Sequence, residues 1–189
     1  LGTSDSAYVL TVTVSGSNVR IYNGSSLLYS GSNATLMRVN LNESAGYLTV
    51  SGCGSGYANG KSYLGNLALS VNSDGSLRVI NIVPTAHYLY GLVPYEMSES
   101  WELETLRSQA VTCKTYAFAF PGSSSDYDIT DSVNYQGYRG YKAGYPKCMQ
   151  ACVDVCGDLL TKDGRIYLTF YGATNGGETE NPKNAFGSP

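Results

Sequence analysis

The sequence predicts an α+β fold, in which an antiparallel β-rich N-terminal portion packs with a core built around one long helix, a second short helix and a C-terminal hairpin. Two observations in the 189 residues lead to this prediction. Short segments rich in Val, Thr and Tyr, separated by Gly, Ser and Asn, occupy residues 1–83. The clear helical patterns fall within residues 84–189. We therefore divide the chain into a β-rich part, 1–83, and a core part, 84–189.

The strands of the β-rich part are predicted from alternation and from the turns between them. Residues 8–14 read YVLTVTV, with Val and Thr at alternating positions, as in a strand with one buried face. Asn23-Gly24 and the segment 72–75, Asn-Ser-Asp-Gly, are hairpin turn sequences, because Asn and Gly tolerate positive φ. We expect further strands at residues 19–22, 35–41, 47–50, 66–71 and 77–83.

One long amphipathic helix is predicted over residues 98–120. Ser98 or Ser100 can serve as its N-cap, and Glu102 and Glu104 are expected in its first turn, where the helix dipole favours acids. Pro121-Gly122 is expected to end it. Its apolar stripe recurs every three or four residues and consists of Leu103, Leu106, Ala110, Cys113 and Ala117.

The remaining core part is predicted from its breaks and turns. A polar loop is expected over residues 123–145, followed by a second, shorter helix at about 147–155. Residues 159–171 are predicted to form a hairpin, with Lys162-Asp163-Gly164-Arg165 at its turn. Residues 175–181 are expected to form a loop.

Composition excludes several classes of protein. A formal net charge of −3 and 14% charged residues argue against a nucleic-acid or anionic-membrane surface, both of which require dense Lys and Arg. The 42% hydrophobic content argues against disorder, and no apolar run approaches the roughly 20 residues that span a bilayer. The 17 tyrosines suit half-wet surfaces, which leaves sugar binding and ordinary sheet faces both open. No signal peptide opens the chain, and residues 1–6 read as an interior segment.

Cysteine and histidine offer few sites for chemistry. Cys148, Cys152 and Cys156 recur every four residues, which would place them on one helical face. They could bind a metal as thiolates or pack the helix against the core. The spacing is not that of a zinc ribbon and no histidine lies nearby, which favours packing. His87 is the only histidine, and no G-x-S-x-G motif accompanies it, so we expect it to be structural.

Glu96 is the candidate acid because of its position rather than its type. It follows the segment 90–95, Tyr-Gly-Leu-Val-Pro-Tyr, and immediately precedes the long predicted helix. Burial against Tyr95, Met97 or Trp101 would raise its pKa, as a general acid requires. The alternative is an acid that only caps the helix, and position alone does not separate the two.

Three ordered blocks carry a resemblance to a known family. The first comprises residues 88–97 (YLYGLVPYEM), 100–111 (SWELETLRSQAV) and 114–117 (KTYA). The second comprises Asp131-Ser132 and residues 136–140 (QGYRG), and the third comprises Tyr171 and residues 175–181 (NGGETEN). The chain thereby resembles the SpoIID/LytB family of stage II sporulation protein D and the amidase enhancers. The β-rich first part is similar to the N-terminal portion of the family, so the resemblance covers nearly the whole chain.

The resemblance implies a peptidoglycan lytic transglycosylase whose catalytic core is residues 84–189. Its catalytic acid falls on Glu96, which would cleave the β-1,4 bond between MurNAc and GlcNAc of denuded glycan strands and leave a 1,6-anhydroMurNAc end. Two basic positions of the family fall on Arg107 and Lys114, with Lys and Arg exchanged, and the implied role is contact with MurNAc lactyl carboxylates or orientation of the acid. The remaining candidates for substrate binding are Asp131, Ser132, Gln136, Tyr171 and Thr179, and hydrogen bonds that stabilise the loops are the alternative role for each.

Two other functions stay open at this point. A non-catalytic module could bind glycan and stimulate a cell-wall amidase, as amidase enhancers do. A structural protein with a thiolate metal site is the third reading. The partners implied by the resemblance are peptidoglycan glycan strands and a cell-wall amidase, with no nucleic acid. The expected location is extracytoplasmic, secreted or in the cell envelope, with membrane anchoring of the parent protein compatible with it.

The sequence departs from the family pattern at several positions. His87 stands where the family commonly has an acid. Asn134 and Tyr135 stand where some sporulation members carry Cys and His as a metal site, so we expect no metal and no cofactor. Family members usually continue further, and we therefore expect part of the glycan groove to lie beyond Pro189.

Overall fold

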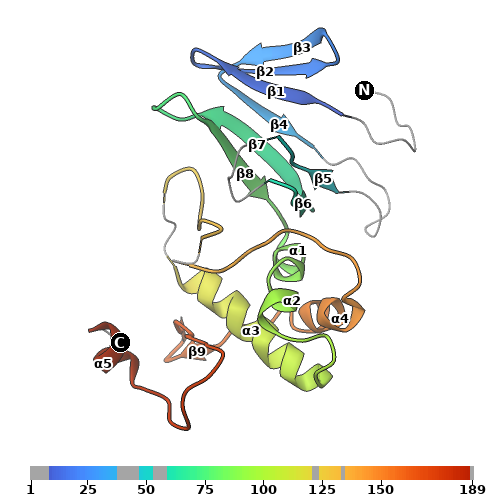
Figure 1. Ribbon diagram of the computed structural model, residues 1–189. Coiled ribbons are helices and arrows are strands. Elements are labelled where there is room, and N and C mark those ends of the chain that lie inside the picture. Colours follow the sequence, from blue (N-terminus) through green and yellow to red (C-terminus); the bar gives the residue numbers. More distant parts are fainter. Residues whose placement is uncertain (1–8, 38–46, 53–58, 121–123, 133–134, 188–189) are drawn as a thin grey trace. The chain divides into compact units, whose positions relative to one another are not determined.

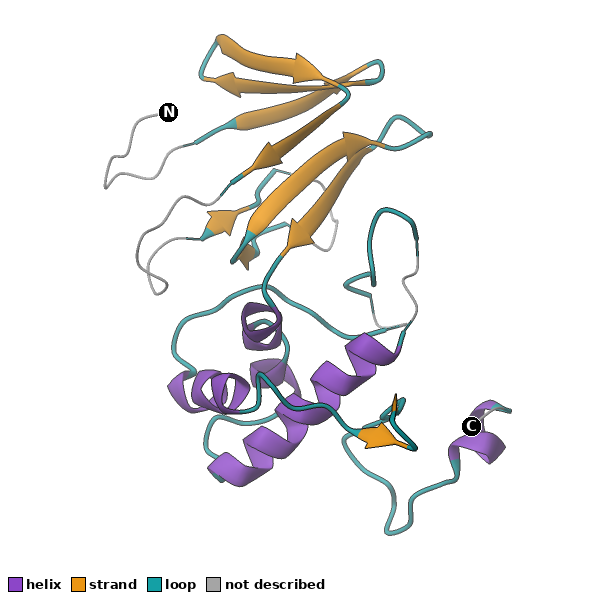
Figure 2. Ribbon diagram, turned by 180° about the vertical axis from the view of Figure 1, so that it is seen from behind, coloured by secondary structure: helices purple, strands orange, loops and turns teal. Residues whose placement is uncertain are grey.

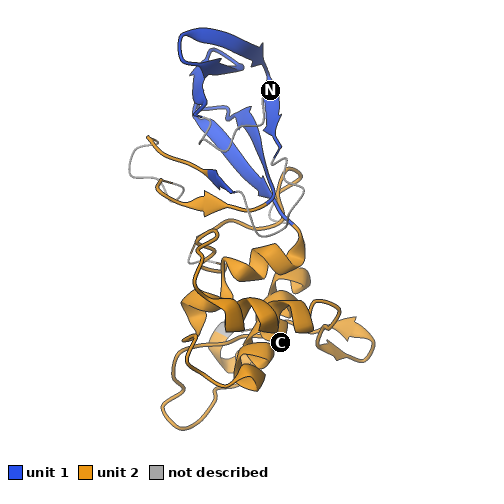
Figure 3. Cartoon of the chain, turned by 90° about the vertical axis from the view of Figure 1, so that its right-hand side faces the viewer, with its two compact units in different colours: residues 1–48, 65–83 blue, residues 49–64, 84–189 orange. Residues whose placement is uncertain are grey.

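The computed structural model describes residues 9–37, 47–52, 59–120, 124–132 and 135–187. The chain divides into two compact units, one of residues 1–48 with 65–83 and one of residues 49–64 with 84–189 (Figure 3). Antiparallel sheets and a few helices confirm the predicted α+β class (Figure 2). The division into domains at 83/84 stays a prediction. Residue 8 and residues 38–41 of two predicted strands, and Pro121-Gly122, lie outside the described residues.

The first unit contains two three-stranded antiparallel sheets, ordered β1-β2-β3 and β4-β7-β8 (Figure 1). Asn23-Gly24 joins β2 to β3, with Gly24 at a φ of 56°. Residues 72–75 join β7 to β8, as the turn sequence predicted. The strands are β1 (Thr11–Ser15), β2 (Asn18–Asn23), β3 (Ser26–Gly31), β4 (Asn33–Leu36), β7 (Asn66–Val71) and β8 (Leu77–Ile82).

The core of the first unit forms where these two sheets face each other. Val19 and Ile21 of β2 and Leu69 of β7 are buried together, and Val12 and Leu36 pack against them. Alternate residues of a strand point to opposite faces, which is why the buried residues recur every second position. Strand β3 was not predicted separately, because all but its last residue are exposed and it therefore shows no alternation.

The second unit is built around α3, against which α1, α2 and α4 pack (Figure 1). Its helices are α1 (Thr85–Tyr90), α2 (Val93–Glu96), α3 (Leu103–Ala119), α4 (Pro146–Asp154) and α5 (Pro182–Phe186). Two short antiparallel pairs complete the strands, β5 (Leu48–Thr49) with β6 (Ser62–Tyr63) and β9 (Thr161–Lys162) with β10 (Arg165–Ile166). In the described part of the chain, no helix combines the length and the apolar character needed to cross a bilayer. The core residues are Leu89, Leu92, Val93, Leu106, Ala110, Cys113, Cys148, Ala151, Cys152 and Val155.

Helix α3 confirms the predicted apolar stripe but begins later than predicted. Leu106, Ala110 and Cys113 are fully buried. The N-cap is Glu102, not Ser98 or Ser100. The two serine hydroxyls bond each other at 2.8 Å, and the Ser98 carbonyl accepts from the Trp101 amide at 3.1 Å. These bonds close a separate turn, which leaves only Glu104 of the two acids inside the first helical turn.

The segment 85–96 is helical, which the sequence did not predict. Helices of six and four residues are too short to display a 3.6-residue period. Gly91 separates them, and a Cβ built on it would lie 2.3 Å from the Tyr138 ring. Its carbonyl accepts from the Arg139 amide at 2.9 Å. Glycine is therefore required where the QGYRG segment crosses the turn between α1 and α2.

Helix α4 and the hairpin after it confirm two further predictions. The N-cap of α4 is Tyr145, which forms no side-chain cap. The Glu99 carboxylate caps the helix instead, accepting from the Lys147 amide at 2.6 Å and the Cys148 amide at 2.9 Å. In the hairpin β9–β10, Asp163 and Gly164 take φ values of 53° and 74°, as a tight hairpin turn requires.

Replacement of Glu99 by Gln should destabilise the protein in a pH-dependent manner. Partial desolvation raises the pKa of Glu99, but the amides of Cys148 and Lys147 outweigh it and leave the pKa below its usual value. The stabilisation is therefore fully present above the unfolded-state pKa of about 4.3 and is lost as pH falls through the lower folded-state pKa. Denaturant unfolding of Glu99→Gln should give a loss of about 1 kcal/mol at pH 7.

The same measurement at acidic pH provides the control for the Glu99 prediction. Once Glu99 is protonated, the wild type also lacks the charged cap, so the difference between the two proteins should shrink. A difference that stays constant between pH 7 and pH 3 would contradict the assignment of the stabilisation to the carboxylate.

Candidate active site

Glu96 is the last residue of α2, where buried neighbours fix the helix. Leu92 and Val93 are fully buried in the core of the second unit, whereas Glu96 is exposed. Met97 follows in an extended conformation and also packs on that core. Six residues separate Glu96 from the start of α3 at Leu103, so it does not immediately precede the long helix as predicted, and it does not cap it.

The surroundings of Glu96 raise the pKa of its carboxyl group above the ordinary glutamate value. Protein atoms close to the carboxyl desolvate it, although the residue as a whole is exposed. The Arg139 guanidinium acts in the opposite direction and lowers the pKa by a smaller amount. Within the described residues, the carboxyl group forms no hydrogen bond. A raised pKa favours the protonated form of the carboxyl group, which is the form that general acid catalysis uses.

A hydrogen-bonded network centred on Gln136 lies close to Glu96. Gln136 is 2% exposed and comes from the predicted QGYRG block. Its Nε2 donates to the Cys113 carbonyl and to the Tyr171 hydroxyl, both at 3.0 Å. Its Oε1 accepts from the Tyr88 hydroxyl at 2.7 Å. All polar atoms of this buried amide are therefore engaged, and α1, α3 and the Tyr171 segment are tied together.

Tyr171 connects this network to the acid. Its hydroxyl accepts from Gln136, and it interacts with the Cys113 thiol. Burial is the main cause of a raised pKa at both Tyr171 and Cys113, about 12 for the thiol. The negative charge of Glu96 contributes to both increases, which places the carboxyl within electrostatic range of the two groups. The structure thus brings together Glu96, Gln136 and Tyr171 from the predicted site residues.

Arg139 belongs to this site and was not among the predicted site residues. Its Cζ lies 5.3 Å from the centre of the Tyr95 ring, directly before Glu96 in the chain. The QGYRG block contains it, so the signal was present in the sequence. Only the fold reveals that the turn after α1 carries this block to Glu96, through the amide of Arg139 on the carbonyl of Gly91.

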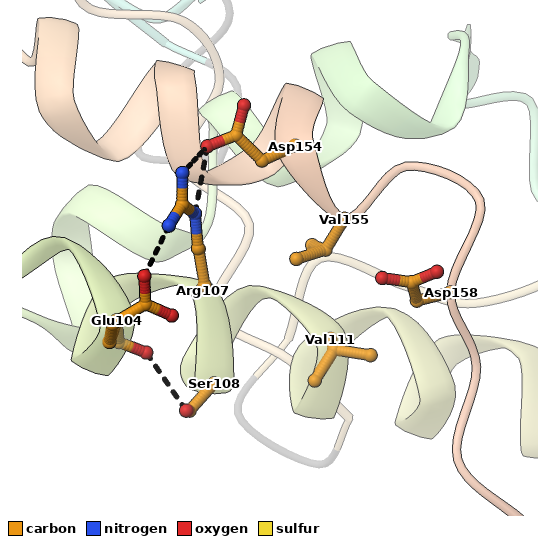
Figure 4. Close-up of a pocket in the computed structure, with 7 residues that line it drawn as sticks. All are labelled: Glu104, Arg107, Ser108, Val111, Asp154, Val155 and Asp158. Atoms are coloured by element: carbon orange, nitrogen blue, oxygen red, sulfur yellow. Dashed lines mark hydrogen bonds and ion pairs between the residues drawn. The ribbon is translucent and has the colours of Figure 1, made fainter.

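Arg107 lies elsewhere, in an ion-pair cluster between α3 and α4. Its guanidinium bonds Glu104 and pairs with Asp154, whose Oδ2 lies 2.8 Å from Nε (Figure 4). A shallow hollow of about 480 Å³ lies over these residues. Glu96 is not among its lining residues, which are Glu104, Arg107, Ser108, Val111, Asp154, Val155 and Asp158. Three carboxylates and one guanidinium line this hollow, so it disfavours an anionic ligand.

Lys114 is buried, with 3% of its surface exposed. Its Nζ donates to the carbonyls of Val155 at 3.1 Å and Cys156 at 2.5 Å. These carbonyls lie at the C-terminal end of α4, where the helix dipole favours a cation. The spacing of seven between Arg107 and Lys114 does place both against α4, where each is bonded to other partners. Their implied contact with substrate has no support in these positions.

The other predicted binding residues lie apart from Glu96 or have other partners. The Asp131 carboxylate pairs with Lys61 at 3.4 Å. The Ser132 hydroxyl bonds that of Thr130 at 2.8 Å. Thr179 is exposed in the C-terminal loop. Their roles in substrate binding stay predictions.

Cys148 and Cys152 of α4 pack in the core, which was the predicted alternative to metal binding. Cys148 and Cys152 are fully buried beside Cys113, and burial raises the pKa of the Cys148 thiol to about 12. Cys156 is exposed and lies beyond the helix, so the three do not share one helical face. Across the ranges that the structure describes, no group of three or more His, Cys, Asp or Glu residues could hold a metal ion. Asn134 lies outside those ranges.

Replacement of Lys114 by Met should destabilise the fold. The two α4 carbonyls would lose their donor, at a cost of about 1–3 kcal/mol in the free energy of unfolding. Lys183→Met is the matched control, because Lys183 is exposed and its change should stay within about 0.5 kcal/mol. Denaturant unfolding checks both values. Unchanged stability combined with lost glycan binding would instead assign Lys114 to the substrate.

Comparisons with known proteins place the site in a family. A family model described as stage II sporulation protein, SpoIID, matches residues 73–161, which include Glu96, Gln136 and Arg139. An uncharacterised protein of Brachyspira hyodysenteriae is 30% identical over 132 residues, 68% of this chain and 36% of that protein. The amidase enhancer of Bacillus subtilis is 33% identical over 92 residues, 49% of this chain and 12% of that protein.

The extent of these matches differs between the proteins compared. The chain spans 36% and 12% of the length of the two relatives. No solved structure matches the chain. The family model covers the first two sequence blocks, and together with the amidase enhancer it confirms the prediction: the chain belongs to the SpoIID/LytB family.

Proposed function

We propose that this chain acts on the bacterial cell wall, outside the cytoplasm, as a peptidoglycan lytic transglycosylase. Its substrate is the glycan strand, and the bond cleaved is the β-1,4 bond between MurNAc and GlcNAc. The observation that carries the proposal is the position of Glu96, an exposed carboxyl with a raised pKa beside the buried Tyr171–Gln136 network. Membership of the family and the similarity to an amidase enhancer support the coarser part, a function related to the cell wall.

The chemistry requires one residue that first gives and then takes a proton. Protonated Glu96 donates to the glycosidic oxygen, and the bond from that oxygen to C1 of MurNAc breaks. GlcNAc leaves with a free 4-hydroxyl group, and positive charge develops at C1 of MurNAc. The MurNAc C6 hydroxyl then attacks C1 while the Glu96 carboxylate takes its proton. A 1,6-anhydro ring closes, the acid is regenerated and no water is consumed.

The neighbours of Glu96 suit this cycle. A single acid suffices because the nucleophile belongs to the substrate, so the paired carboxylates of a hydrolase are not required. Tyr171 and Cys113 have raised pKa values and stay neutral while Glu96 titrates. The Tyr171 hydroxyl is held by Gln136 and therefore offers a fixed dipole on the side of the acid.

A non-catalytic role is the second candidate. The amidase enhancer of Bacillus subtilis is named for stimulating an amidase, and its similarity to this chain favours a glycan-binding module that assists such an enzyme. Such a module would need the surface around Glu96 but not its proton. Only turnover separates the two functions.

Replacement of Glu96 by Gln should abolish turnover without loss of folding. Denuded glycan strands are incubated with each protein, and mass spectrometry measures 1,6-anhydroMurNAc ends. We expect a fall of about 10²–10⁴-fold in the rate, because the proton donor is lost. Glu102→Gln is the matched control, since Glu102 is an exposed neighbouring acid that forms no side-chain cap. Strands that bind the wild type but stay uncut would favour the enhancer role.

The rate should depend on pH through the protonation of Glu96. The active form is the acid, so kcat/KM should fall as pH rises through the pKa of Glu96. Because desolvation raises that pKa, the fall should occur above the ordinary glutamate value of about 4.3. A profile from pH 4 to pH 8 measures its midpoint. A midpoint at or below 4.3 would contradict the assignment.

A further inference from the structure

We propose that Arg139 is a specificity-determining residue that binds the lactyl carboxylate of the MurNAc ring at the scissile bond. The inference rests on the proposed function and deepens it, because it names the lactyl carboxylate as the feature of the glycan that the site recognises. The inference assigns recognition of that carboxylate to Arg139 instead of Arg107 and Lys114, which have other partners.

The backbone holds Arg139 beside the acid. Its amide donates to the Gly91 carbonyl at 2.9 Å, and Gly91 is the residue between α1 and α2. Its guanidinium lies over the Tyr95 ring, with 5.3 Å from Cζ to the ring centre. Tyr95 precedes Glu96 on the same short helix. Two contacts therefore hold the cation next to the carboxyl that carries the reaction.

The guanidinium of Arg139 has donors to offer. The residue is exposed, and within the described residues its guanidinium forms no hydrogen bond or ion pair with another side chain. Stacking on a ring occupies the face of a guanidinium and leaves its edge of N–H groups open. That edge matches a carboxylate in a two-bond geometry, which an ammonium group cannot reproduce.

Three other cations of the second unit already have partners. Arg107 bonds Asp154 and Glu104 in the hollow of Figure 4. Lys114 is buried on two backbone carbonyls. Lys61 pairs with Asp131. An anionic ligand would have to displace a carboxylate at Arg107 or Lys61, whereas at Arg139 it would not.

The chemistry of the substrate supplies an anion at the required place. The lactyl group is attached to C3 of MurNAc, the ring whose C1 loses the glycosidic oxygen. Its carboxylate is free when the stem peptide is absent and becomes a neutral amide when the peptide is attached. A carboxylate held near Glu96 would repel the glutamate when it ionises during the reaction, and an intervening cation offsets that repulsion. Arg139 therefore favours denuded strands over strands that carry peptides.

Binding of two matched glycans tests the inference. One is a labelled denuded strand, and the other is the same strand with its lactyl carboxylates converted to methylamides. Fluorescence anisotropy measures the dissociation constant of each for the full chain. The wild type should bind the methylamide strand about tenfold more weakly, because a charge-assisted pair is lost. Arg139→Gln should bind both strands equally, at about the level of the wild type on the methylamide strand.

Two further variants control for charge and for folding. Arg139→Lys should recover only part of the preference, because it keeps the charge but not the paired geometry. Arg165→Gln removes an exposed arginine of β10 and should keep the full preference. Thermal unfolding should give similar midpoints for all variants, since both arginines are exposed.

The outcomes separate this inference from the proposed function. If Arg139→Gln retains the preference of the wild type, or if the wild type shows none, Arg139 does not read the carboxylate. Failure of the wild type to cut denuded strands would overturn the transglycosylase proposal alone, because the binding ratio is measured without turnover. A preference that disappears in Arg139→Gln and persists in Arg165→Gln supports the inference in either case.

Discussion

The buried amide of Gln136 is the constraint on which the second unit depends. With 2% of its surface exposed, it has no water to replace a lost partner, so its donors and its acceptor must be met by protein. They are met by Tyr88 of α1, the Cys113 carbonyl of α3 and the Tyr171 hydroxyl. One side chain thereby fixes two helices and a segment without regular structure. The charge of Glu96 acts on two members of this framework, Tyr171 and Cys113, whose pKa values it helps to raise.

The charged side chains of this unit fall into two groups with different uses. Glu99 and Lys114 satisfy the two ends of α4, one by accepting from its first amides and the other by donating to carbonyls at its end. Arg107 ties α3 to α4 through Asp154. Glu96 and Arg139 are exposed and make no such bonds within the described residues. Charges used to cap and tie helices cannot also meet a ligand, whereas Glu96 and Arg139 have no such role.

The fold was predictable where the signal is local. Alternation in β2 and β7 identified buried strand faces, and the stripe Leu106, Ala110 and Cys113 identified the inner face of α3. The Asp163-Gly164 turn identified the last hairpin. Predictions failed where short elements carry no period, as in α1 and α2. They also failed where a competing local turn delayed the start of α3, and where the chain leaves the helix at Cys156 after α4.

For the site, the sequence by itself determined the family and the candidate acid, because the motifs that identify them are short segments in a fixed order along the chain. It also supplied Gln136, Tyr171 and the block that contains Arg139. It did not determine which of the cations Arg107, Lys114 and Arg139 accompanies the acid. Only the tertiary structure decided this, because Arg107 pairs with Asp154 and Lys114 with the Val155 carbonyl, each more than forty residues further along the chain. Charged groups pair with whatever lies near them in space. A spacing of seven residues in the sequence therefore cannot show whether a cation bonds a neighbouring helix or a ligand.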